Sequence, residues 1–145
     1  MEVPRELYTI PLGEASIRRE GTDLSIITYG AMVEEALEAA STLSAEDISC
    51  EIIDLRTLVP LDRKAILESV RKTSRALIVH EAVRTGGFGA EVAAIISEEA
   101  FDVLDAPPAR LTAPDTPVPY SPPLEKAFRP DAEKIAARAR ELAAY

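Results

Sequence analysis

The sequence predicts an α/β fold with three layers, in which a mostly parallel five-stranded sheet has helices on both faces and one antiparallel strand at its edge. Short apolar runs alternate along the chain with segments of helical periodicity, an order typical of parallel sheets. Glycine and proline mark the breaks between these segments. The 145 residues fit one domain. We expect a linker arm over residues 1–14 and the domain over residues 15–145.

The first third of the chain contains two predicted strands and a helix. Residues 15–20 and 24–29 flank a Gly-Thr-Asp turn at 21–23, which predicts a hairpin with the edge strand first and the buried strand second. Gly30 then turns the chain into a helix, whose apolar face carries Met32, Val33, Ala36, Leu37 and Ala40.

The middle third continues the alternation of strand and helix. Residues 48–55 predict a strand, and Asp62 is placed to cap a helix with Ala65, Ile66, Ser69 and Val70 on one face. Residues 75–79 predict the strand that leads into a glycine-rich turn. The helix after this turn is expected to run to about Leu104.

The last third begins where the segment 105–108, with its two prolines, stops that helix. Residues 109–113 predict the final strand. Residues 114–130 contain six prolines, so this segment cannot join a sheet, and we expect it to lie extended over the surface. Asp131 is placed to cap a final helix, whose inward face carries Ile135, Ala139 and Leu142.

The glycine turn contains Gly86, Gly87 and Gly89 between a buried strand and a helix start. One interpretation is structural: glycine permits the tight turn and the close approach that dock the helix on the sheet. The other is an anion cradle, because a helix N-terminus offers unpaired N–H groups and a positive dipole end. The spacing matches neither the dinucleotide fingerprint nor the P-loop.

His80 is the chain's only histidine, and it stands beside Glu81 at the end of the predicted strand. The pair is a candidate accessory polar site, because a histidine with a carboxylate can act as a general base. Adjacent strand residues point to opposite faces, however, so the two side chains need not share a pocket. No motif for a serine nucleophile, a metal cluster or a phosphate loop is present.

Composition and charge exclude several classes of function. The net charge of −9 argues against a nucleic-acid partner and favours a basic one. No apolar run reaches the length of a membrane span, and the N-terminus lacks the apolar region of a signal peptide. The single Cys50 cannot form an internal disulfide. We therefore expect a cytoplasmic protein without membrane contact.

Four ordered motifs resemble one family. They are residues 23–33 (DLSIITYGAMV), 51–62 (EIIDLRTLVPLD), 80–91 (HEAVRTGGFGAE) and 114–121 (PDTPVPYS). Together they resemble the C-terminal domain, of transketolase C-terminal fold, of the β subunit of the thiamine-diphosphate-dependent dehydrogenase in 2-oxo acid dehydrogenase complexes, of pyruvate or branched-chain type. The match runs from about Tyr8 to the end of the chain.

The resemblance implies part of an enzyme that oxidatively decarboxylates a 2-oxo acid and transfers the acyl group to lipoyl groups. In that family, thiamine diphosphate and Mg are bound by the α subunit and by a preceding domain of the β subunit. We therefore expect no catalytic, cofactor or metal site in this chain and no activity from it alone. The resemblance also implies that the chain is part of a longer subunit, through truncation or a misassigned start.

The resemblance further implies a domain for subunit assembly and docking. The expected partners are an α subunit, a second β subunit and the basic peripheral-subunit-binding domain of the acyltransferase core. Asp105 and the carboxylate of Tyr145 are the candidate docking groups, and the isolated chain is expected to form a homodimer. Two alternatives are the related domain of a transketolase or deoxyxylulose-phosphate synthase, and a stand-alone regulatory module that binds a small anion.

Overall fold

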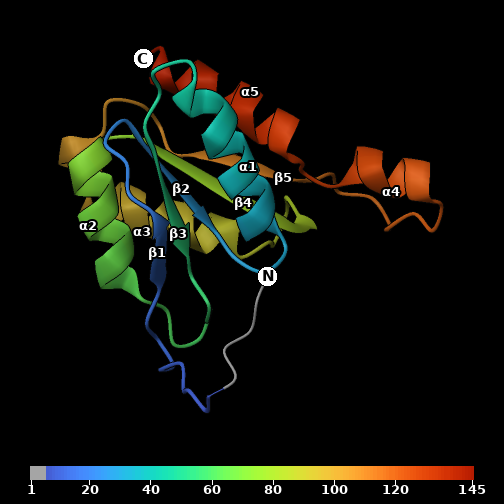
Figure 1. Cartoon of the computed structure of the whole chain (residues 1–145), viewed down its shortest axis with the longest axis horizontal. Helices are drawn as coiled ribbons and strands as arrows, with labels where there is room; N and C mark the ends of the chain where they lie inside the picture. Colours follow the sequence, from blue (N-terminus) through green and yellow to red (C-terminus); the bar gives the residue numbers. More distant parts are fainter. Residues whose placement is uncertain (1–5) are drawn as a thin grey trace.

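The computed structural model describes residues 6–145 (Figure 1). Within them the elements follow the alternation that the sequence predicts. In chain order they are β1 (Ser16–Arg19), β2 (Leu24–Thr28), α1 (Met32–Ser44), β3 (Cys50–Asp54), α2 (Arg63–Thr73), β4 (Ala76–Val83), α3 (Gly89–Glu99), the 3₁₀ helix η1 (Phe101–Val103), β5 (Ala109–Ala113), α4 (Pro122–Phe128) and α5 (Ala132–Ala143).

The five strands form one sheet with the order β1-β3-β2-β4-β5, in which only β1 runs antiparallel to its neighbour. Helices α1 and α5 cover one face of the sheet, and α2 and α3 cover the other (Figure 1). Successive strand residues supply the two cores, so Ile26 packs beneath α1 while Ile27 faces the opposite layer. The predicted three-layer α/β class is confirmed.

The predicted hairpin of the first two strands is wrong. β1 pairs with β3 through Ile17 and Ile53, and β2 lies on the far side of β3. Every residue of β2 is buried, and its two flanks are taken by the parallel strands β3 and β4. The turn that was expected to close the hairpin instead packs against the start of β3, where a Cβ on Gly21 would lie 2.2 Å from the backbone of Cys50.

The proline-rich segment is only partly extended, because it contains the short helix α4. Pro122 and Pro123 occupy its first turn, where a missing N–H leaves no helical hydrogen bond unmade. None of its residues is buried, and the helix lies beyond the end of α5, away from the sheet (Figure 1). Residues 114–130 contribute no strand to the sheet, as expected.

Two boundaries differ from the predicted ones, and two predicted caps are confirmed. β4 continues to Val83, so His80 lies within the strand and not at its end. The helix expected to reach Leu104 ends at Glu99 and is followed by η1. The carboxylates of Asp62 and Asp131 accept the backbone N–H groups of Ala65 and Lys134, respectively, at the starts of α2 and α5.

A polar network lies between the sheet and α2. Glu51 of β3 is fully buried and binds Lys72 and Ser69, both on α2. The hydroxyl groups of Ser25, Ser69 and Thr73 continue the network, with oxygen–oxygen distances of 2.6 Å from Ser25 to each of the other two. The network therefore joins β2, β3 and α2. Among residues 6–145, no helix is long and apolar enough to cross a bilayer.

Candidate functional site

The glycine turn is built around His80. This side chain is fully buried in β4, and its Nε2 accepts the backbone N–H of Gly89, 3.2 Å away, at the first residue of α3. A Cβ on Gly89 would lie 2.4 Å from the same Nε2, and a Cβ on Gly87 would lie 2.7 Å from the ring Cε1. Gly86 has a φ of +73°. All three positions therefore require glycine, two for space and one for conformation.

This geometry favours the structural interpretation of the turn over the anion cradle. A helix N-terminus attracts anions through its unpaired N–H groups. Here the imidazole of His80 already accepts the N–H of Gly89. The neutral Nε2 of His80 thus lies where an anion would accept the helix N–H. The imidazole ring also fills the space beside Gly87 and Gly89.

His80 and Glu81 do not share a pocket. His80 is buried and stacks on Tyr29 at a centroid distance of 6.0 Å, whereas Glu81 is exposed. Burial lowers the pKa of His80, and the guanidinium of Arg110 acts in the same direction against an opposing effect of the Ala82 backbone. The ring Nδ1 has no hydrogen-bond partner among residues 6–145. The two side chains therefore do not form a general base pair.

A cleft of about 590 Å³ lies outside the turn, between the segment before α2 and the start of α3. Its walls are largely apolar, and Arg63 on its rim is paired with Glu99. His80 does not line it. The residues that do are Leu58, Val59, Leu61, Arg63, Gly86, Gly87, Phe88, Ala90, Glu91 and Ile95.

Asp105 and Tyr145 both lie at the amino edge of the sheet. The backbone N–H of Asp105 binds Ser74, just before β4, and its carboxylate lies 3.3 Å from the guanidinium of Arg75. Tyr145 ends the chain after α5 and is exposed. A cleft of about 500 Å³ beside Asp105 is lined by Phe101, Leu104, Pro107 and Pro108, so an acidic group stands next to an apolar surface.

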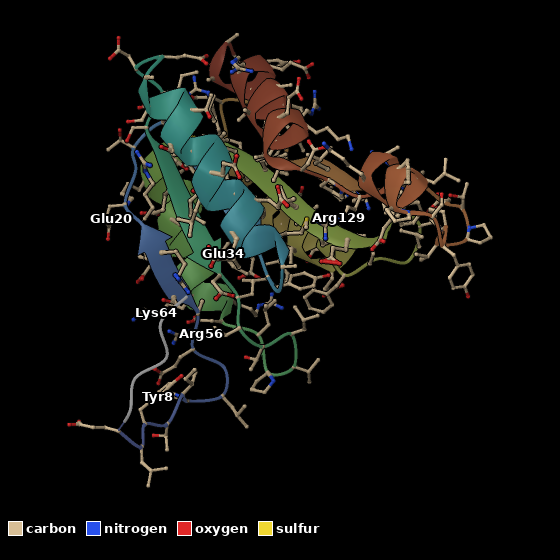
Figure 2. The ribbon with its side chains drawn as sticks, turned by 45° about the vertical axis from the view of Figure 1, so that its right-hand side comes forward. Tyr8, Glu20, Glu34, Arg56, Lys64 and Arg129 are labelled. Atoms are coloured by element: carbon tan, nitrogen blue, oxygen red, sulfur yellow. The ribbon has the colours of Figure 1, made fainter. Side chains whose placement is uncertain are left out.

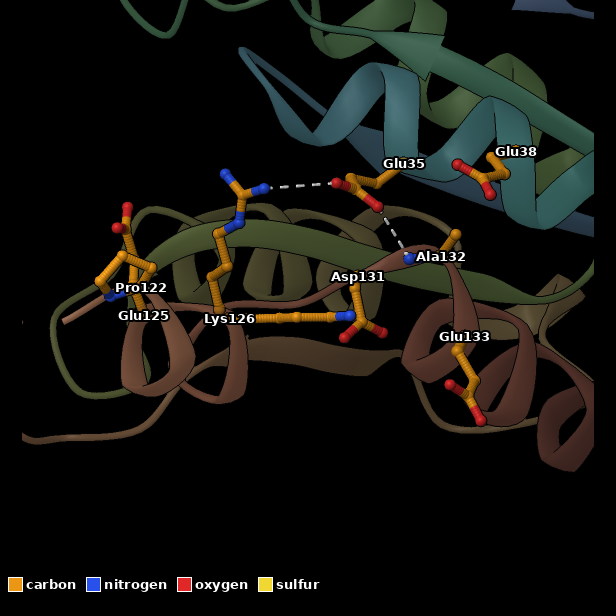
Figure 3. Close-up of a pocket in the computed structure, with 9 residues that line it drawn as sticks. Glu35, Glu38, Pro122, Glu125, Lys126, Asp131, Ala132 and Glu133 are labelled. Carbon is orange, nitrogen blue, oxygen red and sulfur yellow. Dashed lines mark hydrogen bonds and ion pairs between the residues drawn. The ribbon is translucent and has the colours of Figure 1, made fainter. Parts of the chain in front are cut away.

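A second acidic surface was not predicted. In the cleft between α1 and the α4–α5 junction, Glu35 binds the Arg129 guanidinium and the N–H of Ala132 at the start of α5 (Figure 3). Glu38 and Glu133 lie in the same cleft (Figure 3). Arg129 lies 94 positions from Glu35, so the pair leaves no local signal in the sequence.

The described residues do not fit a metal–diphosphate group. Among residues 6–145, no three His, Cys, Asp or Glu side chains are close enough to hold a metal ion together. The start of α3, after the glycine turn, is occupied by His80. Cys50 is buried, and burial raises the pKa of its thiol to about 11, which leaves it protonated and unreactive.

The sequence matches β subunits of three enzymes from Bacillus subtilis (strain 168). It is 47% identical to that of 2-oxoisovalerate dehydrogenase over 145 residues, 50% identical to that of the pyruvate dehydrogenase E1 component over 141, and 47% identical to that of acetoin:2,6-dichlorophenolindophenol oxidoreductase over 141. These matches cover 99%, 97% and 97% of this chain and 44%, 43% and 41% of the relatives, in that order. The chain thus spans less than half the length of the relatives.

A solved structure supports the same relationship. The split-gene transketolase described as an inactive beta4 tetramer superposes with a TM-score of 0.79 at 28% identity, over 98% of this chain and 46% of that chain. The family described as "Transketolase, C-terminal domain" matches residues 13–135. Fold, sequence and family match agree, and the chain belongs to the transketolase C-terminal domain family.

Proposed function

We propose that this chain is the assembly and partner-docking domain of the β subunit of a 2-oxo acid dehydrogenase. One observation carries the proposal: the chain is equally similar, at 47–50% identity, to β subunits of enzymes named for different substrates. A domain whose sequence is about equally similar in all three is expected to perform a role that does not depend on the substrate, such as subunit assembly. The parent reaction is then oxidative decarboxylation of a 2-oxo acid with acyl transfer to lipoyl groups.

Exposed apolar side chains support an assembly role. The N-terminal arm carries Leu7 and Leu12, both largely exposed, and Tyr8 on this arm lies away from the domain (Figure 2). The segment before and within α4 exposes Val118, Tyr120 and Leu124. Such patches are typical of surfaces that a partner covers. The proposed partners are an α subunit and a second β subunit in the cytoplasm.

The cofactor belongs to other parts of the proposed enzyme. Thiamine diphosphate and Mg are expected on the α subunit and on the preceding region of the β subunit. The isolated chain is accordingly expected to turn over neither pyruvate nor branched-chain 2-oxo acids. A related split-gene chain is described as an inactive tetramer. The second candidate is the C-terminal domain of a transketolase-type enzyme, because the split-gene transketolase chain superposes on this chain with a TM-score of 0.79.

The proposed docking surface is the amino edge around Asp105 and Tyr145. A basic peripheral-subunit-binding domain suits a chain with a net charge of −9. The apolar cleft beside Asp105 supplies the contact area that a charge alone lacks. The expected contacts are therefore a carboxylate–guanidinium pair at the rim and apolar packing against Phe101 and Pro107.

Calorimetric titration with a purified peripheral-subunit-binding domain tests this assignment. Asp105→Asn and amidation of the Tyr145 α-carboxylate are each expected to weaken binding by about tenfold, the effect of losing one charge-assisted hydrogen bond. Arg75→Gln is the matched control, because it breaks the same ion pair but leaves the Asp105 carboxylate free. Equal affinity for Asp105→Asn and the unaltered chain would remove Asp105 from the docking surface.

A further inference from the structure

A basic groove runs along β5 in this acidic chain. Four cationic side chains line it (Arg84, Arg110, Arg129 and Lys134), against the single carboxylate of Asp115, and its volume is about 340 Å³. The chain as a whole carries a net charge of −9. The local charge of this surface, which we name the β5 groove, is thus opposite to that of the molecule.

Two of the four cations are already satisfied by the protein. Arg129 pairs with Glu35, and Lys134 pairs with Asp131 and donates to three carbonyl oxygens at the end of α4. Asp115 is bound by the N–H and hydroxyl of Thr85, and the N–H bond is the main cause that holds its pKa below the usual range. The carboxylate of Asp115 is therefore committed to a loop contact.

Arg84 and Arg110 are different, because neither forms an ion pair with a carboxylate within residues 6–145. Each donates to the backbone carbonyl of the other, with nitrogen–oxygen distances of 3.3 Å and 3.0 Å. The crossed bonds hold two positive charges close together. Each guanidinium has further N–H groups in a planar fork that suits carboxylates.

The shape of the groove fits an extended chain. One wall consists of six consecutive residues, Arg110–Asp115, and the other of four, Ala127–Pro130. The first wall is an edge of the sheet, since β5 pairs only with β4 within the described residues 6–145. Arg129, on the second wall, lies where the α4–α5 segment meets the sheet (Figure 2). An edge strand is a template for main-chain hydrogen bonds with an added strand.

We propose that the β5 groove binds an extended, carboxylate-rich segment of a partner protein, which adds to the sheet as a strand beside β5. Main-chain hydrogen bonds along β5 give affinity, and Arg84 and Arg110 select acidic side chains. This surface is separate from the amino edge, where a basic partner is proposed to dock. Failure of either assignment therefore leaves the other intact.

Fluorescence anisotropy with a labelled peptide tests the proposal. The probe is a nine-residue peptide in which glutamate alternates with valine or threonine. We expect saturable binding that weakens as salt is raised, because exposed charges are screened. The double variant Arg84→Gln/Arg110→Gln is expected to bind at least about tenfold more weakly. Arg138→Gln, on the exposed face of α5, removes the same kind of charge and is expected to bind like the unaltered chain.

A second peptide keeps the test independent of variant folding. It has the same sequence with alternate backbone nitrogens methylated, so its charge is kept but its main-chain donors are lost. The proposal expects this peptide to bind at least about tenfold more weakly. Equal binding of both peptides would overturn strand addition. The labelled peptide is also competed with inorganic phosphate and with free glutamate at millimolar concentration. If these small anions displace it as well as the unlabelled peptide does, the groove is a site for small anions and the proposal is wrong.

Discussion

The start of α3 has no room for a methyl group at Gly87 or Gly89, because the ring of His80 lies there. His80 fills the space in front of the helix, and Gly87 and Gly89 leave that space open. The ring of His80 caps the helix by accepting the N–H of Gly89. In turn, the absence of a Cβ at Gly87 and Gly89 allows the ring to lie close to the helix start. The histidine and the turn therefore act as one unit, although Gly89 lies nine positions after His80 in the chain.

Gly89→Ala tests this unit. Its Cβ would lie 2.4 Å from His80 Nε2, so we expect the free energy of unfolding to fall by about 1–3 kcal/mol. In a His80→Ala background the same substitution is expected to cost less, because the clashing ring is gone. Urea unfolding of the four proteins of this cycle measures the coupling. Additive costs would show that the ring is not what excludes the methyl group.

The titration of His80 gives a second test. Burial is the main cause that holds its pKa below the ordinary value of 6.5, so the unfolded chain binds the proton more readily than the folded one. The stabilisation is present above about pH 6.5 and is lost as the pH falls toward the lower folded-state value. We expect the urea midpoint to drop between about pH 7.5 and about pH 5.5.

His80→Gln provides the comparison for this pH dependence. Its amide oxygen keeps an acceptor for Gly89 but does not titrate. The drop in the urea midpoint should therefore become shallower in the variant. An unchanged slope would assign the pH dependence to other groups.

At the scale of elements, the sequence predicts what depends on neighbours in the chain. The five strands and the caps at Asp62 and Asp131 follow from local patterns, and all are found. The position of β1 next to β3 depends on which edge of each strand is left unpaired in the folded sheet, and no local pattern shows this. The short loop between β1 and β2 led to the wrong prediction that these two strands pair as a hairpin. Helix α4 was missed because proline in a first turn resembles proline in an extended segment.

The attachment of α2 to the sheet depends on Lys72. Its partner Glu51 is fully buried, so Lys72→Met leaves a buried carboxylate without its counter-charge. We expect a loss of about 1–2 kcal/mol, reduced from the full cost of a buried pair because Lys72 is partly exposed. Lys64→Met, on the same helix with an exposed partner, is expected to stay within about 0.5 kcal/mol. Equal losses in chemical denaturation would contradict the role of burial.

At the scale of the molecule, the candidate sites depend on contacts that local patterns do not carry. Asp105 was chosen from a resemblance, and the apolar cleft beside it emerges only from folding. The groove around Arg84 and Arg110 joins residues 26 positions apart. In the sequence each arginine is an ordinary surface cation, and their lack of carboxylate partners within residues 6–145 is visible only once the chain is folded.

The exposed apolar surfaces predict self-association of the isolated chain, with a two-fold dimer as the expected state. The double variant Tyr120→Ser/Leu124→Ser removes apolar area from the segment around α4 and is expected to weaken the dimer. Val59→Ser removes another exposed apolar side chain, outside this segment, and serves as the control. Sedimentation equilibrium over a wide concentration range measures both. A monomer at the highest concentration would contradict the interface assignment.

The single histidine also provides an NMR signal that reports on the contact between α3 and the sheet. Because Nε2 accepts the Gly89 N–H, the proton of the neutral ring lies on Nδ1, and one tautomer is fixed. With one histidine in 145 residues, nitrogen NMR of the imidazole gives a single pair of ring signals that needs no assignment. A subunit that docks elsewhere leaves these signals in place, whereas one that pulls α3 from the sheet exchanges the tautomers. Once the chain is enriched in nitrogen-15, assembly is thus observable at the two nitrogens of one ring, and the partner needs no label.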